Sequence, residues 1–444
     1  MDSATETARR IRDGETSAED VVRARIARMD ALDNDINAVI TRNDAAAIER
    51  ALELDDRAVQ GDWVGPLHGV PITVKDMFAT KGVRTTYGMP NLLWHTPDHD
   101  ADVVRALLDA GAVLLGKTNL PLGSYDWQSV HPVHGRCCNP WNLERTVGGS
   151  SGGSAASLAA GFADLEVGSD AAGSIRVPAH YCGVVGIRPT EGMLSDHGHG
   201  DMSLARQPLS NFSVVGPMSR TVEDLELAWS VMRDDPEPSD EPAVDELRIA
   251  WSVERGAMPV TRAVARVMAE FRQTLADAGA QVVEAEPDID DWDAMKLWGR
   301  INGYELRGSF PGVSTLPGIR RLSEWYWFRH RLGPGEFVEA TRKGFRDSEA
   351  TYREHLERRQ DIIGTAEAFF AGFDAWILPG MPFAAFEHRP SGVAIPADDN
   401  RENYADSHAI YHCPLVTMDC PVLSLPIAVN DGGLPLGIQI AGPR

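Results

Sequence analysis

Thr146-Val-Gly-Gly-Ser150-Ser151-Gly-Gly-Ser154 belongs to the most informative part of this sequence. Glycine and serine together are typical of a flexible linker. Here they run directly into Ala155-Ala-Ser-Leu-Ala-Ala160, a strong helix former, and then into a strand-like segment that ends at Gly168. Because a linker does not lie inside such a unit, we interpret the glycines as a sharp turn that points backbone amides inward, as the binding of an oxyanion requires.

A second segment, Gly168-Ser-Asp170-Ala-Ala-Gly173-Ser174-Ile-Arg176-Val-Pro178, adds another candidate serine nucleophile. Neither segment holds an acid-base partner, and a serine hydroxyl is a poor nucleophile at neutral pH unless a base takes its proton. The best candidate base lies upstream, where the strand-like run from Val70 to Val74 is followed by Lys75. Two serines and a lysine together indicate an amide-bond hydrolase.

The rest of the chain alternates between strand-like and helix-like segments. Such alternation predicts an α/β fold, with a large mixed β-sheet core flanked by helices on both faces. The first sixty-odd residues look helical throughout, with Ser17 as N-cap, so we expect the sheet to begin only after them. The strand-like segments are residues 70–74, 112–115, 165–167, 212–215, 247–251, 281–283, 375–378 and 422–429, and the helix-like ones include 102–110, 222–232 and 261–278.

The segment Gly111-Ala-Val-Leu-Leu-Gly116-Lys117-Thr118 fits the phosphate-binding loop pattern of nucleotide enzymes. A phosphate-binding loop follows a strand and opens a helix. Here Gly111 follows a helix-like segment, and the four residues after it are strand formers. We therefore interpret this segment as the end of a helix, a strand and a turn.

Residues Gly148-Gly-Ser150-Ser-Gly152 also match the nucleophile elbow of α/β-hydrolases. That elbow must follow a buried strand, whereas residues 139–145 before it are polar and interrupted by proline. His388, His408 and His412 lie downstream, so composition alone leaves partners for such a triad available.

Two histidine-containing segments have spacings that suit a transition metal: His131-x-x-His134-x-x-Cys137-Cys138 and His197-Gly-His199. No second paired set at zinc-finger spacing accompanies either segment. We interpret both as ordinary polar loop residues.

Composition narrows the classes of partner. The net charge is −23, from 65 acidic and 42 basic residues, which argues against a nucleic-acid groove or an anionic membrane as partner. The N-terminus lacks the apolar core of a signal peptide, and no apolar run reaches the roughly 20 residues that span a bilayer. Five cysteines are an odd number that does not suggest a disulfide framework. We expect a cytoplasmic protein, a monomer or a homodimer.

Seven segments together resemble the amidase signature family, and they run from about residue 65 to 220 and recur at the C-terminus. No single one is specific, but the set is. They are Gly69-Val-Pro-Ile-Thr-Val-Lys75-Asp76, Gly116-Lys-Thr-Asn119, Asn139-Pro140-Trp141, Gly148-Gly-Ser150-Ser-Gly-Gly-Ser154, Gly168-Ser-Asp-Ala-Ala-Gly-Ser174-Ile-Arg-Val-Pro178, Gly186-Ile-Arg-Pro-Thr190 and Gly433-Leu-Pro-Leu-Gly-Ile-Gln-Ile-Ala-Gly442.

This resemblance implies that Ser174 is the nucleophile, that Ser150, held after a cis peptide bond, relays the proton, and that Lys75 is the base. Lysine at its ordinary pKa of about 10.4 is protonated, so burial must favour the neutral amine. The resemblance also implies an oxyanion hole and a bracing set, with neither cofactor nor metal. The oxyanion hole comprises the backbone amides of Ala171, Ala172, Gly173 and Ser174, and the bracing residues are Ser151, Asp170 and Arg176.

The sequence departs from the family pattern in two places. Ala172 stands where family members commonly have a second glycine, so the turn there must accommodate a Cβ atom. The sequence also ends at Arg444, soon after the last motif, where relatives usually continue into another helix. We expect this to expose an edge that a partner subunit covers.

We expect one domain in four parts: an N-terminal helical segment (1–64), the catalytic core (65–234), a variable α/β region (235–374) and C-terminal strands that complete the core (375–444). The variable region begins with an acidic, proline-rich linker over about 235–246. It continues into a helical insert rich in aromatic residues, namely Trp292, Trp298, Trp325, Tyr326 and Trp327.

The acyl group of the substrate is expected near Gly123, Ser124 and Tyr125 and beside the loop 379–383, with the aromatic insert shaping the outer pocket. Apolar walls without an evident carboxylate-binding arginine favour hydrophobic or aryl amides, and acyl-enzyme chemistry extends to esters and carbamates such as urethanes. A glutaminase subunit of a tRNA-dependent amidotransferase and a catalytically inactive scaffold remain as alternatives.

Overall fold

The structure is a computed structural model that describes residues 2–200, 212–233, 242–256, 258–306 and 332–444. An eleven-stranded mixed β-sheet runs through it. In spatial order its strands are β1 (Val39–Arg42), β3 (Val113–Thr118), β2 (Pro71–Lys75), β8 (Leu165–Asp170), β10 (Val214–Ser219), β9 (Val185–Arg188), β16 (Val422–Val429), β17 (Pro435–Ala441), β13 (Ala375–Pro379), β11 (Arg248–Trp251) and β12 (Gln281–Glu284).

Short strand pairs and helices surround this sheet. The pairs are β4 (Val130–His131) with β5 (Gly135–Arg136), β6 (Cys138–Asn139) with β7 (Asn142–Thr146), and β14 (Ile395–Ala397) with β15 (Asn400–Glu402). The α-helices are α1 (Ala4–Arg12), α2 (Ala18–Ile36), α3 (Asp44–Val59), α4 (Asp102–Asp109), α5 (Gly152–Ala160), α6 (Arg176–Cys182), α7 (Val222–Arg233), α8 (Arg262–Asp277), α9 (Asp291–Leu306), α11 (Glu336–Gly344), α12 (Glu349–Phe370) and α13 (Tyr404–Thr417), and the 3-10 turns are η1 (Pro90–Leu92), η2 (Leu122–Ser124) and η3 (Val244–Glu246).

Helices cover both faces of the sheet, as the alternating pattern predicts. One face packs on α2, α3, α5 and α6 through a cluster that includes Val22, Leu54 and Ala155. The other face packs on α1, α4 and α7 through residues such as Ala8, Leu107 and Met232. Because both faces are covered, the central strands β2 and β8 are buried at every position. Buried parallel strands of this kind are typical of α/β proteins.

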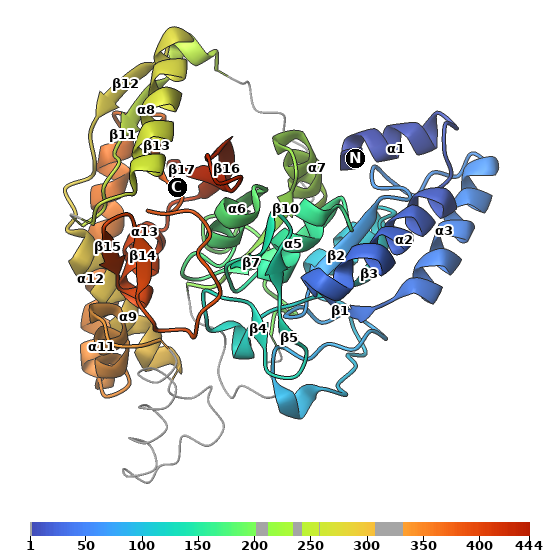
Figure 1. Cartoon of the computed structure of the whole chain (residues 1–444), viewed down its shortest axis with the longest axis horizontal. Helices are drawn as coiled ribbons and strands as arrows, with labels where there is room; N and C mark the ends of the chain where they lie inside the picture. The colour runs from blue at the N-terminus through green and yellow to red at the C-terminus, as the bar shows by residue number, and fades with distance from the viewer. Residues whose placement is uncertain (1, 201–211, 234–241, 257, 307–331) are drawn as a thin grey trace.

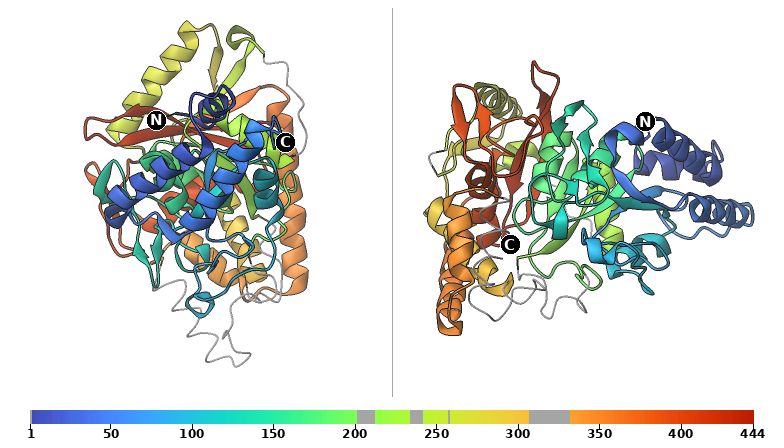
Figure 2. Two further views of the ribbon diagram at one scale, coloured as in Figure 1. Left: turned by 90° about the vertical axis from the view of Figure 1, so that its right-hand side faces the viewer. Right: turned by 60° about the horizontal axis from the view of Figure 1, so that its bottom comes forward.

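The chain crosses the molecule from one end to the other. The N-terminal elements lie on the right in Figure 1, residues 70–230 occupy the middle, and α8, α9, α11, α12 and α13 gather on the left with β11, β12 and β13. The right-hand view of Figure 2 shows the same progression, and α2 and α3 lie side by side at the N-terminal end. The middle section therefore holds the glycine-serine segments, and the C-terminal elements close one side of it.

The N-terminal segment is not purely helical, which corrects the expectation that the sheet begins after it. Val39–Arg42 forms β1, the edge strand of the main sheet, paired antiparallel with β3. A four-residue strand of this kind escapes a periodicity argument because it is shorter than the helices on either side. The helix before it begins as predicted, since the Ser17 side chain accepts a hydrogen bond from the Asp20 amide at 3.0 Å.

Other expectations need adjustment at their ends. The strand expected at 212–215 runs instead from Val214 to Ser219, and α13, which sequence reasoning missed, is buried along its whole length. Of the acidic linker, 234–241 lies outside the described residues and 244–246 forms η3. Of the aromatic insert, Trp292 and Trp298 lie on α9, whereas Trp325, Tyr326 and Trp327 lie outside the described residues.

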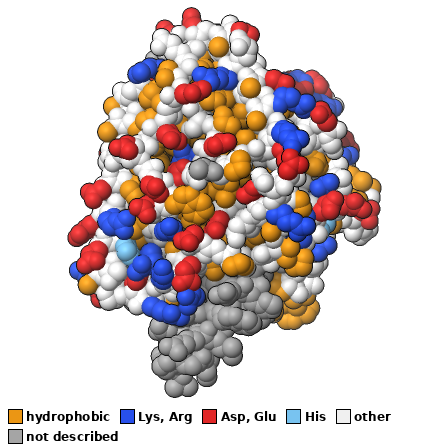
Figure 3. Space-filling view, turned by 60° about the vertical axis from the view of Figure 1, so that its left-hand side comes forward, with side chains coloured by type: hydrophobic (Ala, Val, Ile, Leu, Met, Phe, Trp, Pro, Cys, Tyr) orange, Lys and Arg blue, Asp and Glu red, His pale blue; other side chains and the backbone are white. Residues whose placement is uncertain are grey.

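The surface carries both signs of charge. On the face shown in Figure 3, acidic and basic side chains are interspersed with hydrophobic ones, without a continuous patch of one sign. Among the described helices, none combines the length and apolar character that crossing a membrane requires. All five cysteines are free thiols.

Candidate active site

Two neighbouring strands bring the lysine and the second serine segment together. β2 and β8 run parallel, with Val74 opposite Val167, so their carboxyl ends lie at the same edge of the sheet. Lys75 is the last residue of β2, and Ser169 and Asp170 are the last of β8. Ser150 lies just before α5, after a cis Gly149–Ser150 peptide bond. Sheet edges of this kind are where α/β proteins bind ligands.

Lys75 sits at the centre of the site and is fully buried. Its Nζ donates to Ser150 Oγ at 2.8 Å and to Ser169 Oγ at 2.9 Å. Burial lowers the pKa of Lys75 from 10.5 to about 7, although the negative charges of Asp170 and Glu166 oppose that shift. At neutral pH a substantial fraction of this amine is therefore unprotonated and able to act as a base.

The two predicted serines differ in exposure. Ser150 is buried, whereas Ser174 is partly exposed, and both line the same pocket. Within the described residues, the Ser174 hydroxyl has no hydrogen-bond partner, and no hydrogen bond joins it to Ser150. The site thus places a buried serine on the lysine and an accessible serine in the pocket.

Asp170 and Arg176 hold the turn between β8 and α6. Both side chains are fully buried, and Arg176 Nη2 donates to Asp170 Oδ1 at 3.0 Å. Burial opposes ionisation of Asp170, but the charge and hydrogen bonds of Arg176 outweigh it and hold the pKa of this carboxyl well below its usual range. Asp170 also accepts from the backbone amides of Gly173, at 2.8 Å, and Ile175, at 3.0 Å. A permanently charged carboxylate therefore organises the whole turn.

The Gly173 amide departs from the expected set of oxyanion donors. Because it already donates to Asp170, it is not free to bind an oxyanion, and the four expected amides reduce to those of Ala171, Ala172 and Ser174. Gly173 itself has φ of +98°, and a Cβ atom there would lie 2.6 Å from Cγ of His412. Glycine is required at this position by both conformation and space.

Two tryptophans orient the neighbouring peptide groups. Trp298 Nε1 donates to the carbonyl of Ala171, and Trp127 Nε1 donates to the carbonyl of Ala172, each at 2.9 Å. In a trans peptide the N–H points opposite to the carbonyl. The Ala171 carbonyl faces Trp298, so the amide of Ala172 points away from that indole.

Ser151 connects the two serine segments, consistent with the bracing role expected of it. Its amide donates to the carbonyl of Ser174 at 3.1 Å, and its hydroxyl donates to the carbonyl of Ser169 at 3.3 Å. Arg176 extends the connection to β17 through Gln439 Oε1 at 2.9 Å. The C-terminal strands thereby support the turn that carries Ser174.

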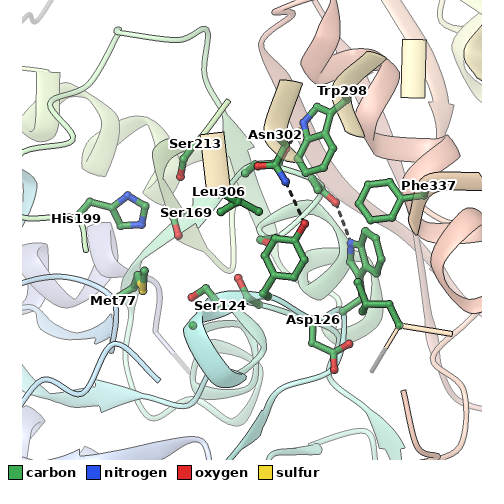
Figure 4. Close-up of a pocket in the computed structure, with 18 residues that line it drawn as sticks. Met77, Ser124, Asp126, Ser169, His199, Ser213, Trp298, Asn302, Leu306 and Phe337 are labelled. Carbon is green, nitrogen blue, oxygen red and sulfur yellow. Dashed lines mark hydrogen bonds between the residues drawn. The ribbon is translucent and has the colours of Figure 1, made fainter. Parts of the chain in front are cut away.

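A pocket opens above these residues (Figure 4). Gly123, Ser124 and Tyr125 line it as expected, and the Tyr125 hydroxyl accepts from Asn302 Nδ2 at 3.0 Å. The complete described lining is Met77, Gly123, Ser124, Tyr125, Asp126, Trp127, Ser150, Ser169, Ala171, Ala172, Ser174, His199, Ser213, Trp298, Asn302, Leu306, Leu332 and Phe337.

The loop 379–383 is absent from this described lining, contrary to expectation. Gly380 donates to the carbonyl of Gly437 at 2.9 Å, and a Cβ atom on Gly380 would lie 2.5 Å from Nδ1 of His180. Gly380 is therefore tied to β17 and α6, while Met381 and Phe383 belong to the apolar cluster that also contains the pocket residues Trp127, Trp298 and Phe337. Trp298 of the aromatic insert does line the pocket, as expected of that region.

Sequence reasoning missed four residues of the site: Ser169, His199, Trp298 as an orienting donor, and Asn302. Ser169 lies inside a quoted segment, and its position on a parallel neighbour of β2 was the available signal. The sequence predicts that His199, like His197, is an ordinary polar loop residue. That interpretation suits His197, whose side chain is 67% exposed, but His199 is 3% exposed and lines the pocket.

The competing motifs take other roles. Lys117 of the phosphate-loop match lies on β3, after α4, and donates to Thr80 Oγ1 at 2.7 Å in a buried setting. The segment before Ser150 does contain a strand, β7, but it belongs to a two-stranded pair outside the main sheet, unlike the strand of a nucleophile elbow.

The candidate histidines of an elbow triad and the possible metal ligands are also accounted for. His388 contacts the carbonyl of Leu143, His408 stacks on Trp127, and His412 packs against Gly173. His131 accepts through Nδ1 from the amides of Val133 and His134 at 3.0 and 3.1 Å. Cys137 is buried in an apolar cluster, and Cys138 is half-buried.

Comparison with known proteins shows the family to which the chain belongs. The Amidase family model matches residues 20–444. The chain is 30% identical to an acylamidase of Rhodococcus erythropolis, over 99% of this chain and 91% of the relative. It is 34% identical to a glutamyl-tRNA(Gln) amidotransferase subunit of Salinispora tropica, over 99% of this chain and 93% of the relative.

A solved structure supports the same assignment. The 6-aminohexanoate cyclic dimer hydrolase superposes with a TM-score of 0.78 at 25% identity, covering 100% of this chain and 93% of that protein. The mixed sheet, the glycine-serine segments at its edge and the family match lead to one conclusion. The chain belongs to the amidase signature family, a family of hydrolases that act on amides.

Proposed function

We propose that this protein hydrolyses carboxamide C–N bonds through an acyl-enzyme intermediate, with Ser174 as nucleophile, Ser150 as proton relay and Lys75 as base. The single observation that carries the proposal is a fully buried lysine, with its pKa lowered to about 7, in contact with Ser150 Oγ at 2.8 Å. A buried, partly neutral amine on a serine hydroxyl is the arrangement that activates a weak nucleophile.

The proton moves from Ser174 through Ser150 to Lys75, and the Lys75–Ser150 hydrogen bond is the second part of this path. When Lys75 is neutral, its contact with Ser150 runs with the hydroxyl as donor, so Ser150 passes its proton to Nζ and takes one from Ser174. The Ser174 oxygen then bonds to the carbonyl carbon. When the C–N bond breaks, the proton returns through Ser150 to the leaving nitrogen, and water later cleaves the acyl-serine ester by the same path in reverse.

The negative charge that develops on the carbonyl oxygen meets the amides of Ala171, Ala172 and Ser174. Removing one donor of an oxyanion hole typically raises the barrier by about 2.7–4 kcal/mol. Trp298 and Asp170 support this role because they fix the peptide planes on either side of the turn.

The pocket supports hydrophobic or aryl amides as substrates. Trp127, Trp298, Leu306, Leu332 and Phe337 form an apolar wall, and the described lining contains no arginine or lysine that could bind a carboxylate. Because the acyl-enzyme is independent of the leaving group, esters and carbamates (urethanes) of the same acyl group are further substrates. The protein works without a subunit of a different protein, as a monomer or homodimer. Free thiols are compatible with the cytoplasm.

A second candidate is the glutaminase subunit of a tRNA-dependent amidotransferase. The likeness to the amidotransferase protein of Salinispora tropica, at 34% identity, favours it. It requires a site for the charged ends of free glutamine and a partner that receives ammonia. The described lining includes Asp126 but no arginine or lysine to bind the carboxylate of glutamine, which opposes that requirement.

One set of assays tests the proposal. The purified protein is given anilides, aryl carbamates, short aliphatic amides and glutamine, alongside Ser174→Ala and Lys75→Ala. We expect hydrolysis of anilides and carbamates by the wild type and loss of at least about a thousand-fold in both variants. Activity that survives Ser174→Ala would refute the nucleophile. Release of ammonia from glutamine, without hydrolysis of the other substrates, would support the second candidate.

A further inference from the structure

His199 is a buried histidine at the edge of the pocket whose role the triad does not explain. Its side chain stacks on Phe78, with ring centroids 4.7 Å apart. The backbone around it is fixed, because Ala79 donates to the carbonyl of Gly198 and Gly200 donates to the carbonyl of Met77, each at 2.8 Å. The imidazole is therefore held in one place.

Neither ring nitrogen of His199 has a hydrogen-bond partner among the described residues, although the residue is 3% exposed and lines the pocket. A buried polar group without a partner costs about 1–3 kcal/mol. Some other buried histidines avoid this cost. His180, for example, lies 3.2 Å from the carbonyls of Gly437 and Phe383. A group that enters the pocket can supply the partner that His199 lacks.

The charge state of His199 defines what it can bind. Burial, and secondarily the positive charge of Lys75, lower the pKa of His199 to about 3. At neutral pH the ring is therefore uncharged, with one N–H donor and one acceptor nitrogen. Such a ring suits a neutral hydroxyl, amide or carbonyl group and does not suit a carboxylate.

The pocket has two chemically different sides. Figure 4 shows His199, Met77, Ser169 and Ser213 on one side and Trp298, Asn302 and Phe337 on the other. The side that holds His199, Ser169 and Ser213, called the polar side, adjoins Lys75. Ser169 accepts from Lys75 at 2.9 Å, and the charge of Lys75 acts on His199. The apolar side adjoins the carbonyls of Ala171 and Ala172, which the two tryptophans bind.

The proton path decides which part of a substrate occupies which side. The leaving nitrogen receives its proton from Ser150 and Lys75, so the leaving group lies on the lysine side of the scissile bond. The acyl group then extends toward Trp298 and Phe337. His199 consequently faces the leaving group.

We propose that His199 is a specificity-determining residue that hydrogen-bonds the leaving group, and that the preferred substrates carry a hydroxyl, amide or carbonyl group on the departing amine. This inference rests on the proposed function, because the proton path assigns the two sides. A leaving group with such a substituent supplies the hydrogen-bond partner that His199 lacks among the described residues.

The test uses anilides of one aryl acid that differ only in the leaving amine: aniline and the three hydroxyanilines. We expect the wild type to hydrolyse at least one hydroxyanilide with a kcat/KM about ten-fold above that of the plain anilide. His199→Leu removes both ring nitrogens and should reduce the ratio of kcat/KM for the hydroxyanilide to kcat/KM for the plain anilide to about one. His199→Gln should restore part of this ratio.

His197→Leu is the matched control, since His197 lies two residues away in the same loop with an exposed side chain. It should retain the wild-type ratio. Equal values of kcat/KM for all four anilides in the wild type, or an equal fall on every anilide in His199→Leu, would overturn the inference. Activity that persists in Ser174→Ala overturns the proposed function as well. The Ser174→Ala variant therefore distinguishes a failure of the proposed function from a failure of the His199 inference alone.

Discussion

Lys75 Nζ lies 2.9 Å from Ser169 Oγ, which makes Ser169 a second hydroxyl on the buried lysine, beside Ser150. The contact arises because β2 and β8 are parallel neighbours and both residues lie at their carboxyl ends. Two hydrogen bonds to serines fix the direction of the Lys75 ammonium group. Once the group has lost a proton, the lone pair of the neutral amine therefore points at the serine that must lose its own proton.

Ser169→Ala should therefore lower kcat by about ten-fold with little change in KM, because one hydrogen bond that positions the amine is lost. Ser169 accepts from the charged lysine and so favours the protonated form. Its loss should lower the pKa of Lys75 and move the acid limb of the pH profile to lower pH. Ser230→Ala on α7 is the control, since the Ser230 hydroxyl donates only to the Leu227 carbonyl of its own helix. A fall in KM and kcat together, without a shifted limb, would contradict the positioning role.

The pH dependence of kcat/KM should follow the neutral form of Lys75. With its pKa lowered to about 7, activity rises about ten-fold per pH unit below that value, as the lysine loses its proton, and levels off above it. Burial also raises the pKa of Glu166 to about 7, so the titration of Glu166 must be distinguished from that of Lys75.

The substitution Glu166→Gln distinguishes the two titrations. The negative charge of Glu166 raises the pKa of Lys75, so its removal should move the acid limb to lower pH without abolishing it. A limb that disappears in Glu166→Gln would identify the glutamate as the titrating group.

Asp170→Asn should destabilise the fold by about 3–5 kcal/mol, because it leaves the fully buried Arg176 without its charge partner. Urea denaturation measures the change. Asp399→Asn is the matched control. It removes one partner of the exposed Arg262–Asp399 pair, whose side chains are 76% and 86% exposed, and should cost less than about 1 kcal/mol. Equal effects of the two substitutions would refute a structural role for the buried pair.

Gly173→Ala should cost roughly 1–3 kcal/mol of stability and most of the activity, because φ is +98° and the new Cβ would meet the His412 ring. Gly61→Ala isolates the backbone contribution, since φ there is +74° and nothing lies within 4 Å of the new Cβ. The difference between the two free energies of unfolding then measures the contact with His412. Full activity in Gly173→Ala would show that the turn tolerates a displaced amide.

Sequence alone determined the parts of this protein that depend on local pattern. Alternating segments predicted a mixed sheet with helices on both faces, and the set of motifs pointed to the family that the comparisons confirm. Lys117 illustrates the same strength, since the strand formers around it excluded a phosphate loop, and the residue lies on β3. These conclusions needed only periodicity and turn chemistry, which neighbouring residues encode.

Contacts between groups far apart in the chain became visible only in the folded structure. The register of β2 against β8 placed Ser169 on Lys75, and the turn of Asp170 took the Gly173 amide out of the expected oxyanion set. The burial of His199 without a partner among the described residues, and the absence of loop 379–383 from the described pocket lining, likewise depend on packing between segments far apart in the chain. Side-chain burial and hydrogen-bond partners across a sheet are set by long-range pairing, and no local pattern of residues specifies them.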